Sequence, residues 1–237
     1  MTQPVCAIIG VGPGNGEAFA KKFTEEGYRV ALLSRNESYL KGLESQIPGS
    51  TAYAYDATDP AKAEQVLTAI KQEMGPIQTL LYNAGSGLFG NLDATELEDV
   101  EAAWRVNAYG LFAAAKTVVP HMRGLGGGNI VVTGATSAVK HNANFMAFTS
   151  AKAAQRAMAQ SMAKHLGPEK IHVSYVIVDG VIDLPRTREM IQQQNQEVPD
   201  DFFLQPDDIA SAVYYLTQQP QSAWTFELDV RPFKEKW

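Results

Sequence analysis

The chain has 237 residues, of which 45% are hydrophobic and 19% are charged, a composition typical of a soluble globular domain with a full core. Its net charge of −6 at pH 7, without any run of Lys or Arg, argues against binding to a nucleic-acid backbone. No apolar run reaches the roughly 18 residues of a membrane span, and the four histidines lack carboxylate or thiol partners at metal-ligand spacing, so we expect neither a membrane protein nor a metal site.

The first predicted element is a strand over residues 5–9, Val-Cys-Ala-Ile-Ile. No basic residue precedes this apolar segment, so we expect no signal peptide. Cys6 is the only cysteine, which excludes an intramolecular disulfide and fits a cytoplasmic location.

A glycine-rich turn, Gly10-Val-Gly-Pro-Gly14-Asn-Gly16, joins this strand to a predicted helix over residues 15–26. Glycines in such a turn let backbone N–H groups and the helix N-terminus approach a phosphate, because a Cβ atom would be in the way. The turn therefore indicates a nucleotide-binding protein, with Gly10, Gly14 and Gly16 as candidate cofactor-binding residues. By itself, a glycine turn is a weak signal.

Apolar strand-like runs then alternate with helical patterns to the end of the chain. The further strands are predicted over residues 28–34, 51–55, 77–82, 129–133, 171–178 and 225–230. The further helices are predicted over residues 37–46, 60–74, 96–122, 147–166 and 206–218. Because the strands are apolar on both faces, we predict an α/β fold, a single Rossmann-type domain over residues 1–237 with a doubly wound parallel sheet of about seven strands.

The end of the second strand, Ser34-Arg35-Asn36-Glu37, concerns the choice of cofactor. An Asp or Glu at this point would accept hydrogen bonds from a ribose diol and repel a 2′-phosphate. Ser34 stands there instead, and the guanidinium of Arg35 beside it matches phosphate oxygens in charge and shape. The pattern favours NADP(H) over NAD(H). Alternatively, Arg35 is a solvated turn residue, and Glu37 speaks against a phosphate.

The third strand is followed by Asp56 and Ala57, which are candidates for the adenine end of a cofactor site. A carboxylate there could accept a hydrogen bond from the adenine amine. The alternative, an N-cap for the helix that starts near Pro60, fits Asp59 better than Asp56.

The fourth strand ends in Asn83-Ala84-Gly85, and the later motifs are Asn107 within Val-Asn-Ala-Tyr-Gly and Lys152 within Ser-Ala-Lys-Ala-Ala. Together with the glycine turn, this order and spacing resembles the short-chain dehydrogenase/reductase family over essentially the whole chain. The resemblance implies that Asn83, Ala84 and Gly85 support the sheet beside the cofactor. It also implies that Asn107 holds a water in a proton relay and that Lys152 binds the nicotinamide ribose.

Two catalytic positions of that family carry other residues here. The family's tyrosine lies four residues before the lysine, and Phe148 occupies that position here. The enoyl-reductase variant places the tyrosine seven residues before the lysine, where this chain has Phe145. The family's serine lies thirteen residues before the tyrosine, which is Ala135. Because neither Phe148 nor Ala135 has a hydroxyl group, the usual proton donor and its partner are absent, and a carbonyl reductase of this kind would be slow.

Three neighbouring polar residues, Thr136, Ser137 and His141, are candidates to replace the missing groups, although a structural or surface role is favoured for each. Phe145 and Phe148, with Met146, form an apolar wall for a hydrophobic substrate or simply pack at a helix start.

The remaining expectations concern the cofactor amide, the lid and the oligomer. The family's Pro-Gly after the sixth strand reads Asp179-Gly180, so Val181 and Ile182 are left to offer backbone groups to the nicotinamide amide. By resemblance, the segment 183–204 covers the substrate. The helices 96–122 and 147–166 would pair into a homodimer or homotetramer interface, and Trp237 would pack on a neighbouring subunit or fray.

The sequence thus predicts an NADP(H)-dependent oxidoreductase acting on a small, hydrophobic carbonyl or alcohol. A first alternative is a dinucleotide-binding sensor or partner subunit with little or no catalysis, since Ala135 and Phe148 lack hydroxyls. A second is an S-adenosylmethionine-dependent methyltransferase, whose glycine loop looks similar but would want an acid in place of Ser34.

Overall fold

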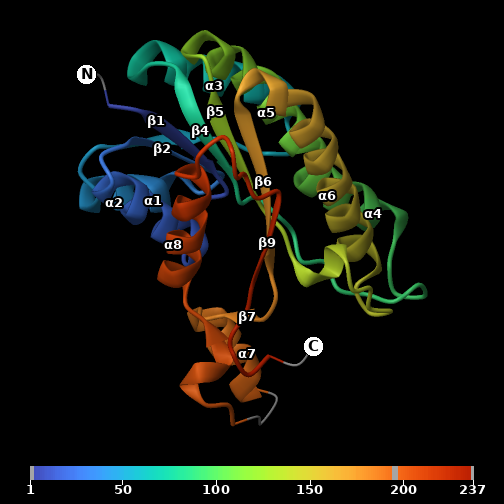
Figure 1. The fold of residues 1–237 in the computed structure, drawn as a ribbon. Coiled ribbons are helices and arrows are strands. Elements are labelled where there is room, and N and C mark those ends of the chain that lie inside the picture. Colours follow the sequence, from blue (N-terminus) through green and yellow to red (C-terminus); the bar gives the residue numbers. More distant parts are fainter. Residues whose placement is uncertain (1–2, 194–196, 236–237) are drawn as a thin grey trace.

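Seven parallel strands form the central sheet of the computed structural model, which describes residues 3–193 and 197–235 (Figure 1). The strand order is β3-β2-β1-β4-β5-β6-β9, and every neighbouring pair is parallel. The strands of this sheet are β1 (Val5–Ile9), β2 (Arg29–Ser34), β3 (Ser50–Ala54), β4 (Ile77–Tyr82), β5 (Gly128–Thr133), β6 (Ile171–Val178) and β9 (Glu227–Val230). The predicted doubly wound α/β sheet is therefore confirmed.

Helices cover both faces of the sheet (Figure 1). They are α1 (Asn15–Glu25), α2 (Glu37–Gln46), α3 (Pro60–Met74), α4 (Leu97–Trp104), α5 (Gly110–Leu125), α6 (Met146–Leu166), α7 (Pro185–Gln193) and α8 (Pro206–Thr217). Single short turns lie at Thr136–Ala138, Gly167–Glu169 and Asp200–Phe202. A small separate pair of strands, β7 (Val181–Ile182) and β8 (Phe203–Leu204), lies next to α7.

The alternation along β1 explains the two layers of core. Val5, Ala7 and Ile9 belong to the apolar cluster shared with α3 and α5, whereas Cys6 and Ile8 belong to the cluster shared with α1, α2 and α8. Successive side chains of a strand point to opposite faces, so a strand covered on both faces must be apolar throughout.

The chain reverses its direction of travel across the sheet at β1. It moves from β1 through β2 to β3 on one side and then returns to β4 on the other side. In open parallel sheets, the helices on either side of such a reversal leave a crevice at the carboxyl ends of the strands. Gly10 after β1 and Asn83 after β4 lie at this point.

The prediction of a single helix over 96–122 was wrong in one respect. A π-helical turn over Arg105–Tyr109 separates two helices, α4 and α5. The Tyr82 hydroxyl donates a 2.5 Å hydrogen bond to the Val106 carbonyl inside this turn. Gly110 then packs so closely that an added Cβ would lie 2.3 Å from the Ala57 carbonyl oxygen and 2.4 Å from the Tyr82 hydroxyl oxygen. The extra residue in the turn is thus fixed by contacts with the sheet.

The other predicted elements differ from the structure only near their ends. Helix α5 runs on to Leu125, beyond the predicted end at 122, and the last strand begins at Glu227 rather than 225. Segment 183–204 contains α7 and β8 as well as polar turns. Residues 194–196 of that segment and Trp237 lie outside the described residues. Within the described ranges, no helix is long and apolar enough to cross a bilayer.

Candidate functional site

A cavity of about 1080 Å³ lies at the carboxyl ends of the strands, where the chain reverses. Most of the cofactor-binding residues predicted from the sequence line it. They are Gly10, Gly16, Ser34, Arg35, Asp56, Ala57, Asn83, Ala84, Gly85, Lys152 and Ile182. The tertiary structure therefore brings together residues that are up to 172 positions apart in the chain, from Gly10 to Ile182.

The glycine turn is built by close approach of backbone segments. An added Cβ at Gly10 would lie 2.4 Å from the Ala84 backbone nitrogen, and one at Gly16 would lie 2.8 Å from the Gly10 carbonyl oxygen. Gly14 precedes the first residue of α1 with φ 96°, a conformation that L side chains rarely adopt. It does not line the cavity, because the side chain of Leu184 packs against it.

The turn after β4 is joined to the turn after β1. The Asn83 backbone N–H donates to the Ile9 carbonyl at 2.8 Å, and the Asn83 side-chain amide donates to the Gly10 carbonyl at 2.8 Å. These two bonds fix the separation between the two sides of the cavity floor. Asn83 is thus a structural support of the glycine turn.

One end of the cavity carries Arg35 and Asp56. Arg35 is exposed, directly after β2, and the Asp56 carboxylate accepts hydrogen bonds from the Thr58 backbone N–H at 2.9 Å and hydroxyl at 2.8 Å. Burial disfavours the charged form of Asp56, but these bonds and the charge of Arg35 outweigh it and lower its pKa. As expected, it is Asp59 that caps α3.

Lys152 lies at the opposite end of the cavity. Its ammonium nitrogen donates to the Thr133 carbonyl at 2.9 Å and to the Gln155 side-chain oxygen at 3.0 Å, and it lies 5.9 Å from the centre of the Phe148 ring. Burial lowers the pKa of Lys152 to about 7. Lys152 can therefore hold or release a proton near neutral pH.

Asn107 is fully buried in the π-helical turn and does not itself line the cavity. Its side-chain nitrogen donates to the Ala103 carbonyl at 2.9 Å, while its Oδ1 has no hydrogen-bond partner among the described residues. Both Asn107 Oδ1 and Lys152 Nζ lie beside Gly85, at 3.0 Å and 3.6 Å from the position of an added Cβ. The two predicted catalytic residues therefore both lie next to Gly85.

The wall beside Lys152 is apolar. Phe145, Phe148 and Ala135 line the cavity there, so aromatic rings and a methyl group occupy the positions at which the family resemblance expected hydroxyls. The Phe145 ring packs on Phe89 with centroids 4.8 Å apart. Met146, expected in the same wall, is 38% exposed and does not line the cavity.

Of the three candidate replacements for the missing hydroxyls, Thr136 and Ser137 line the cavity and the exposed His141 does not. The Thr136 hydroxyl donates to the Asp179 carboxylate at 2.6 Å. Asp179 in turn is 3.1 Å from an Arg231 guanidinium nitrogen. Thr136 therefore links the turn after β5 to the end of β6, which is a structural role.

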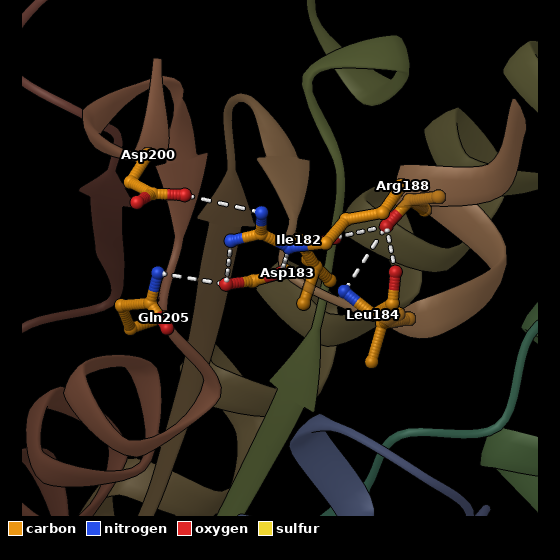
Figure 2. A network of polar contacts seen from close by, with 7 residues as sticks. Ile182, Asp183, Leu184, Arg188, Asp200 and Gln205 are labelled. Carbon is orange, nitrogen blue, oxygen red and sulfur yellow. Dashed lines mark hydrogen bonds and ion pairs between the residues drawn. The ribbon is translucent and has the colours of Figure 1, made fainter. Parts of the chain in front are cut away.

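The segment from β7 to α7 closes one side of the cavity through Ile182, Leu184, Pro185 and Arg186. Figure 2 shows the Arg188 guanidinium between Asp183 and Asp200. Two bonds of 2.5 Å and 2.8 Å join it to Asp183, and one of 3.1 Å joins it to Asp200. The hydrogen bonds from Arg188 lower the pKa of Asp183. The neighbouring Thr187 hydroxyl donates to the Ile182 carbonyl at 2.7 Å and accepts from the Leu184 N–H at 3.0 Å, which holds these two residues in place.

Four residues that line the cavity also carry a buried polar side-chain atom. Asn15 Oδ1, Ser34 Oγ, Tyr55 Oη and Ser86 Oγ belong to lining residues and have no hydrogen-bond partner within the described parts of the chain. Buried polar atoms are normally paired. The glycine turn has no room for a Cβ atom at Gly10 or Gly16 and fits a diphosphate. The unpaired polar atoms of the lining residues fit a polar ligand such as a dinucleotide.

Several of these residues were missed by sequence reasoning. Asn15 lies between two glycines of the turn and Tyr55 directly precedes Asp56, so their position in the motifs could have indicated them. Gln155, one helical turn after Lys152, could have been found from its spacing. Among the described residues, no group of three or more His, Cys, Asp or Glu side chains could hold a metal ion.

Comparisons with known proteins show the family and the fold of this chain. The model of the short chain dehydrogenase family matches residues 4–196. An uncharacterized oxidoreductase of Staphylococcus aureus (strain MRSA252) is 25% identical over 234 residues, which cover 98% of this chain and 98% of the relative.

Two solved structures extend the likeness to three dimensions. The short-chain dehydrogenase from Rhodopseudomonas palustris has 31% identity and a TM-score of 0.83, covering 97% of this chain and 99% of that one. A metagenomic short-chain oxidoreductase in complex with NADP has 24% identity and a TM-score of 0.83, covering 98% of this chain and 97% of that one. Because the family model spans most of the chain and the dehydrogenase fold is shared from end to end, this protein belongs to the short-chain dehydrogenase/reductase family of oxidoreductases.

Proposed function

We propose that this protein binds NADP(H) in the cavity and exchanges a hydride with a small, hydrophobic carbonyl or alcohol. The observation that carries the proposal is the cavity itself, with the glycine turn on its floor, Arg35 at one end and Lys152 at the other. The solved NADP complex of the same fold supports the choice of cofactor.

Each part of the cavity has a role in this proposal. The glycine turn and the N-terminus of α1 would hold the diphosphate, and Asp56 with Ala57 would face the adenine. Lys152 would donate to the nicotinamide ribose, and the backbone of Ile182 would bind the nicotinamide amide. Asn107, whose Oδ1 lies beside Gly85, would hold a water in a proton relay. The bound cofactor supplies the hydride.

The preference for NADP(H) rests on charge at the end of β2. Arg35 is exposed there and faces the cavity, whereas an acidic residue that would bind a ribose diol is replaced by Ser34. Arg35 is exposed at this rim, and a guanidinium can form two hydrogen bonds to a phosphate.

The proton side of the reaction is unusual in this site. Reduction of a carbonyl needs a proton at the oxygen as well as a hydride at the carbon, and Ala135 and Phe148 cannot supply it. Lys152, with its pKa lowered to about 7 by burial, holds a proton at Nζ beside the Phe148 ring. We assign the proton-holding role to Lys152 and expect slow turnover, because a positioned hydroxyl acid typically contributes about 10²–10⁴ in rate.

The lack of hydroxyl groups at Ala135 and Phe148 favours a second candidate function, a cofactor-binding sensor or partner subunit with little catalysis. Methyl and phenyl groups at Ala135 and Phe148 leave the binding cavity complete while removing two hydroxyls. Enzyme-like turnover with any carbonyl or alcohol would exclude this alternative.

The test is a titration with NADPH, NADH and S-adenosylmethionine in separate cells, followed by the heat of binding or by tryptophan fluorescence. The proposal expects saturable binding of NADPH at micromolar concentration, weaker binding of NADH and none of S-adenosylmethionine. Absence of binding of both nicotinamide cofactors would refute it, and preferential binding of S-adenosylmethionine would establish the methyltransferase alternative.

We further propose a homodimer or homotetramer, in the cytoplasm. An apolar stripe on α4, at Leu97, Val100 and Trp104, is 84%, 37% and 42% exposed, and Phe112 on α5 is 48% exposed. Exposed apolar side chains at helical spacing are typical of a subunit contact. The single cysteine, buried and without a disulfide, supports the location.

A further inference from the structure

Gln155 is a fully buried polar side chain next to the candidate active site, and the proposed function does not use it. It lies three residues after Lys152 on α6, so both side chains are on the same face of the helix. Burying an amide without hydrogen bonds costs free energy. The hydrogen bonds of Gln155 must therefore offset the cost of burying its amide.

Both ends of the Gln155 amide are hydrogen-bonded. The oxygen Oε1 accepts from Lys152 Nζ at 3.0 Å, and the nitrogen Nε2 donates to the Asn107 carbonyl at 2.8 Å. An ammonium can only donate and a carbonyl can only accept, so these neighbours define which end of the amide is oxygen. The Tyr175 hydroxyl lies 3.5 Å from the same Oε1.

These bonds fix the position of the Lys152 ammonium. Two of its three N–H groups are used by the Thr133 carbonyl and Gln155 Oε1, at 2.9 Å and 3.0 Å, which leaves one for a ligand. Gln155 is itself held by the π-helical turn through Asn107. The amide therefore connects the lysine to the turn that separates α4 from α5.

The groups around Lys152 contain no carboxylate among those described here. From β5 it meets the Thr133 carbonyl, and from its own helix Gln155 and the Phe148 ring. The Asn107 amide lies beside the same glycine, Gly85. Tyr175 on β6 is the titratable group that shares Gln155 with it. The carbonyl dipoles of Thr133 and Gln155 are thus the local support for a positive charge on Lys152.

We propose that Gln155 is a positioning residue that holds the Lys152 ammonium against Thr133, so that its remaining N–H faces the cavity and its charge is maintained there. One consequence of this inference rests on the proposed function: Gln155 sets the strength of nicotinamide cofactor binding through Lys152.

The first test measures the titration of Lys152 directly in the ligand-free protein. Lysine with an isotope-labelled Cε is incorporated, the Lys152 signal is assigned with Lys152→Arg, and its chemical shift is followed against pH. Gln155→Glu places a carboxylate beside Nζ and is expected to raise the midpoint by more than about one pH unit, since an opposite charge at this distance shifts a pKa by about 1–3. Gln155→Met removes the carbonyl dipole and is expected to lower it.

A matched control is Gln160→Met, because Gln160 is exposed on the same helix. It should leave the titration of Lys152 unchanged. If the midpoint is the same in wild type, Gln155→Glu and Gln155→Met, Gln155 only fills space and the inference is refuted. Thermal melting of each variant shows whether the fold is intact.

The second test measures the Kd for NADPH between about pH 6.5 and about pH 9.5. In wild type the affinity should fall as Lys152 loses its proton, and Gln155→Glu should move that fall to higher pH. Gln155→Met should weaken binding about tenfold, the loss expected for one charge-assisted hydrogen bond. If wild type binds no nicotinamide cofactor, the proposed function fails, while the titration of Lys152 still decides the role of Gln155.

Discussion

The side chain of Leu184 packs directly on Gly14. A Cβ added at Gly14 would lie 2.3 Å from Leu184 Cδ2, and the backbone there has φ 96°. Leu184 is 7% exposed and directly follows Asp183, which is bonded to Arg188, as Figure 2 shows. The start of α7 thus rests on the N-terminus of α1, at the point where a diphosphate would bind.

This contact predicts energetic coupling between the two positions. Gly14→Ala should lower the free energy of unfolding by about 1–3 kcal/mol because of backbone strain. The displacement of Leu184 by the new methyl group should destabilise the protein further. Leu184→Ala should relieve the clash, so the double variant should be less destabilised than the sum by about 1–3 kcal/mol. Denaturant unfolding measures this, and Gly42→Ala, with open space around it in α2, is the control. Additive effects would contradict the packing.

Arg35 is expected to select the phosphorylated cofactor. Removing one hydrogen-bonding charge partner costs about 1.5–3 kcal/mol, so Arg35→Ala should weaken NADPH binding at least tenfold and leave NADH binding unchanged. Calorimetric titrations with both cofactors provide the measurement. Arg123→Ala, which removes a charge paired with Glu169 away from the cavity, should change neither. An equal loss for both cofactors would argue against a phosphate contact.

Restoring the missing hydroxyls should increase turnover. The double variant Ala135→Ser and Phe148→Tyr should reduce carbonyls with NADPH about 10²-fold faster than wild type, because a positioned acid and its partner act as a unit. The measurement is NADPH oxidation with a panel of hydrophobic aldehydes and ketones. Phe145→Tyr, in the same wall, serves as the comparison. A wild-type rate equal to that of the double variant would show that another group already donates the proton.

Lys152 should make stability depend on pH. Its folded pKa of about 7 lies below its ordinary value of 10.5, so the unfolded state binds more protons between these limits and stability rises as pH increases through this window. The slope should reach about 1 kcal/mol per pH unit in wild type. Urea unfolding of Lys152→Met from about pH 7 to about pH 9 should give a flatter profile. Parallel profiles would mean that folding does not lower the pKa of Lys152.

The exposed apolar stripe on α4 and α5 predicts a subunit contact. Phe112→Glu should shift the sedimentation coefficient towards that of a monomer, because a charge would be buried in an apolar interface. Tyr215→Glu, at a 63% exposed position on α8, should leave the oligomer unchanged. A monomeric wild type at micromolar concentration would refute the oligomer.

The sequence by itself determined the layered sheet and most of the candidate site. Strands such as 5–9 that are apolar on both faces, together with the glycine turn and the spacing to Lys152, require a parallel sheet and place polar residues at its carboxyl ends. These are local or periodic properties of the chain, so they can be recognised without knowing which distant residues are in contact.

Only the tertiary structure decided how the site is supported. The π-helical turn depends on the bond from the Tyr82 hydroxyl to the Val106 carbonyl and on the close packing of Gly110 against Ala57. The Gln155 amide reaches a carbonyl 48 residues away. Leu184 reaches Gly14 across an even longer separation in the chain. No period or propensity encodes such pairs, because their energies arise from side chains that meet only once the sheet and its helices have packed.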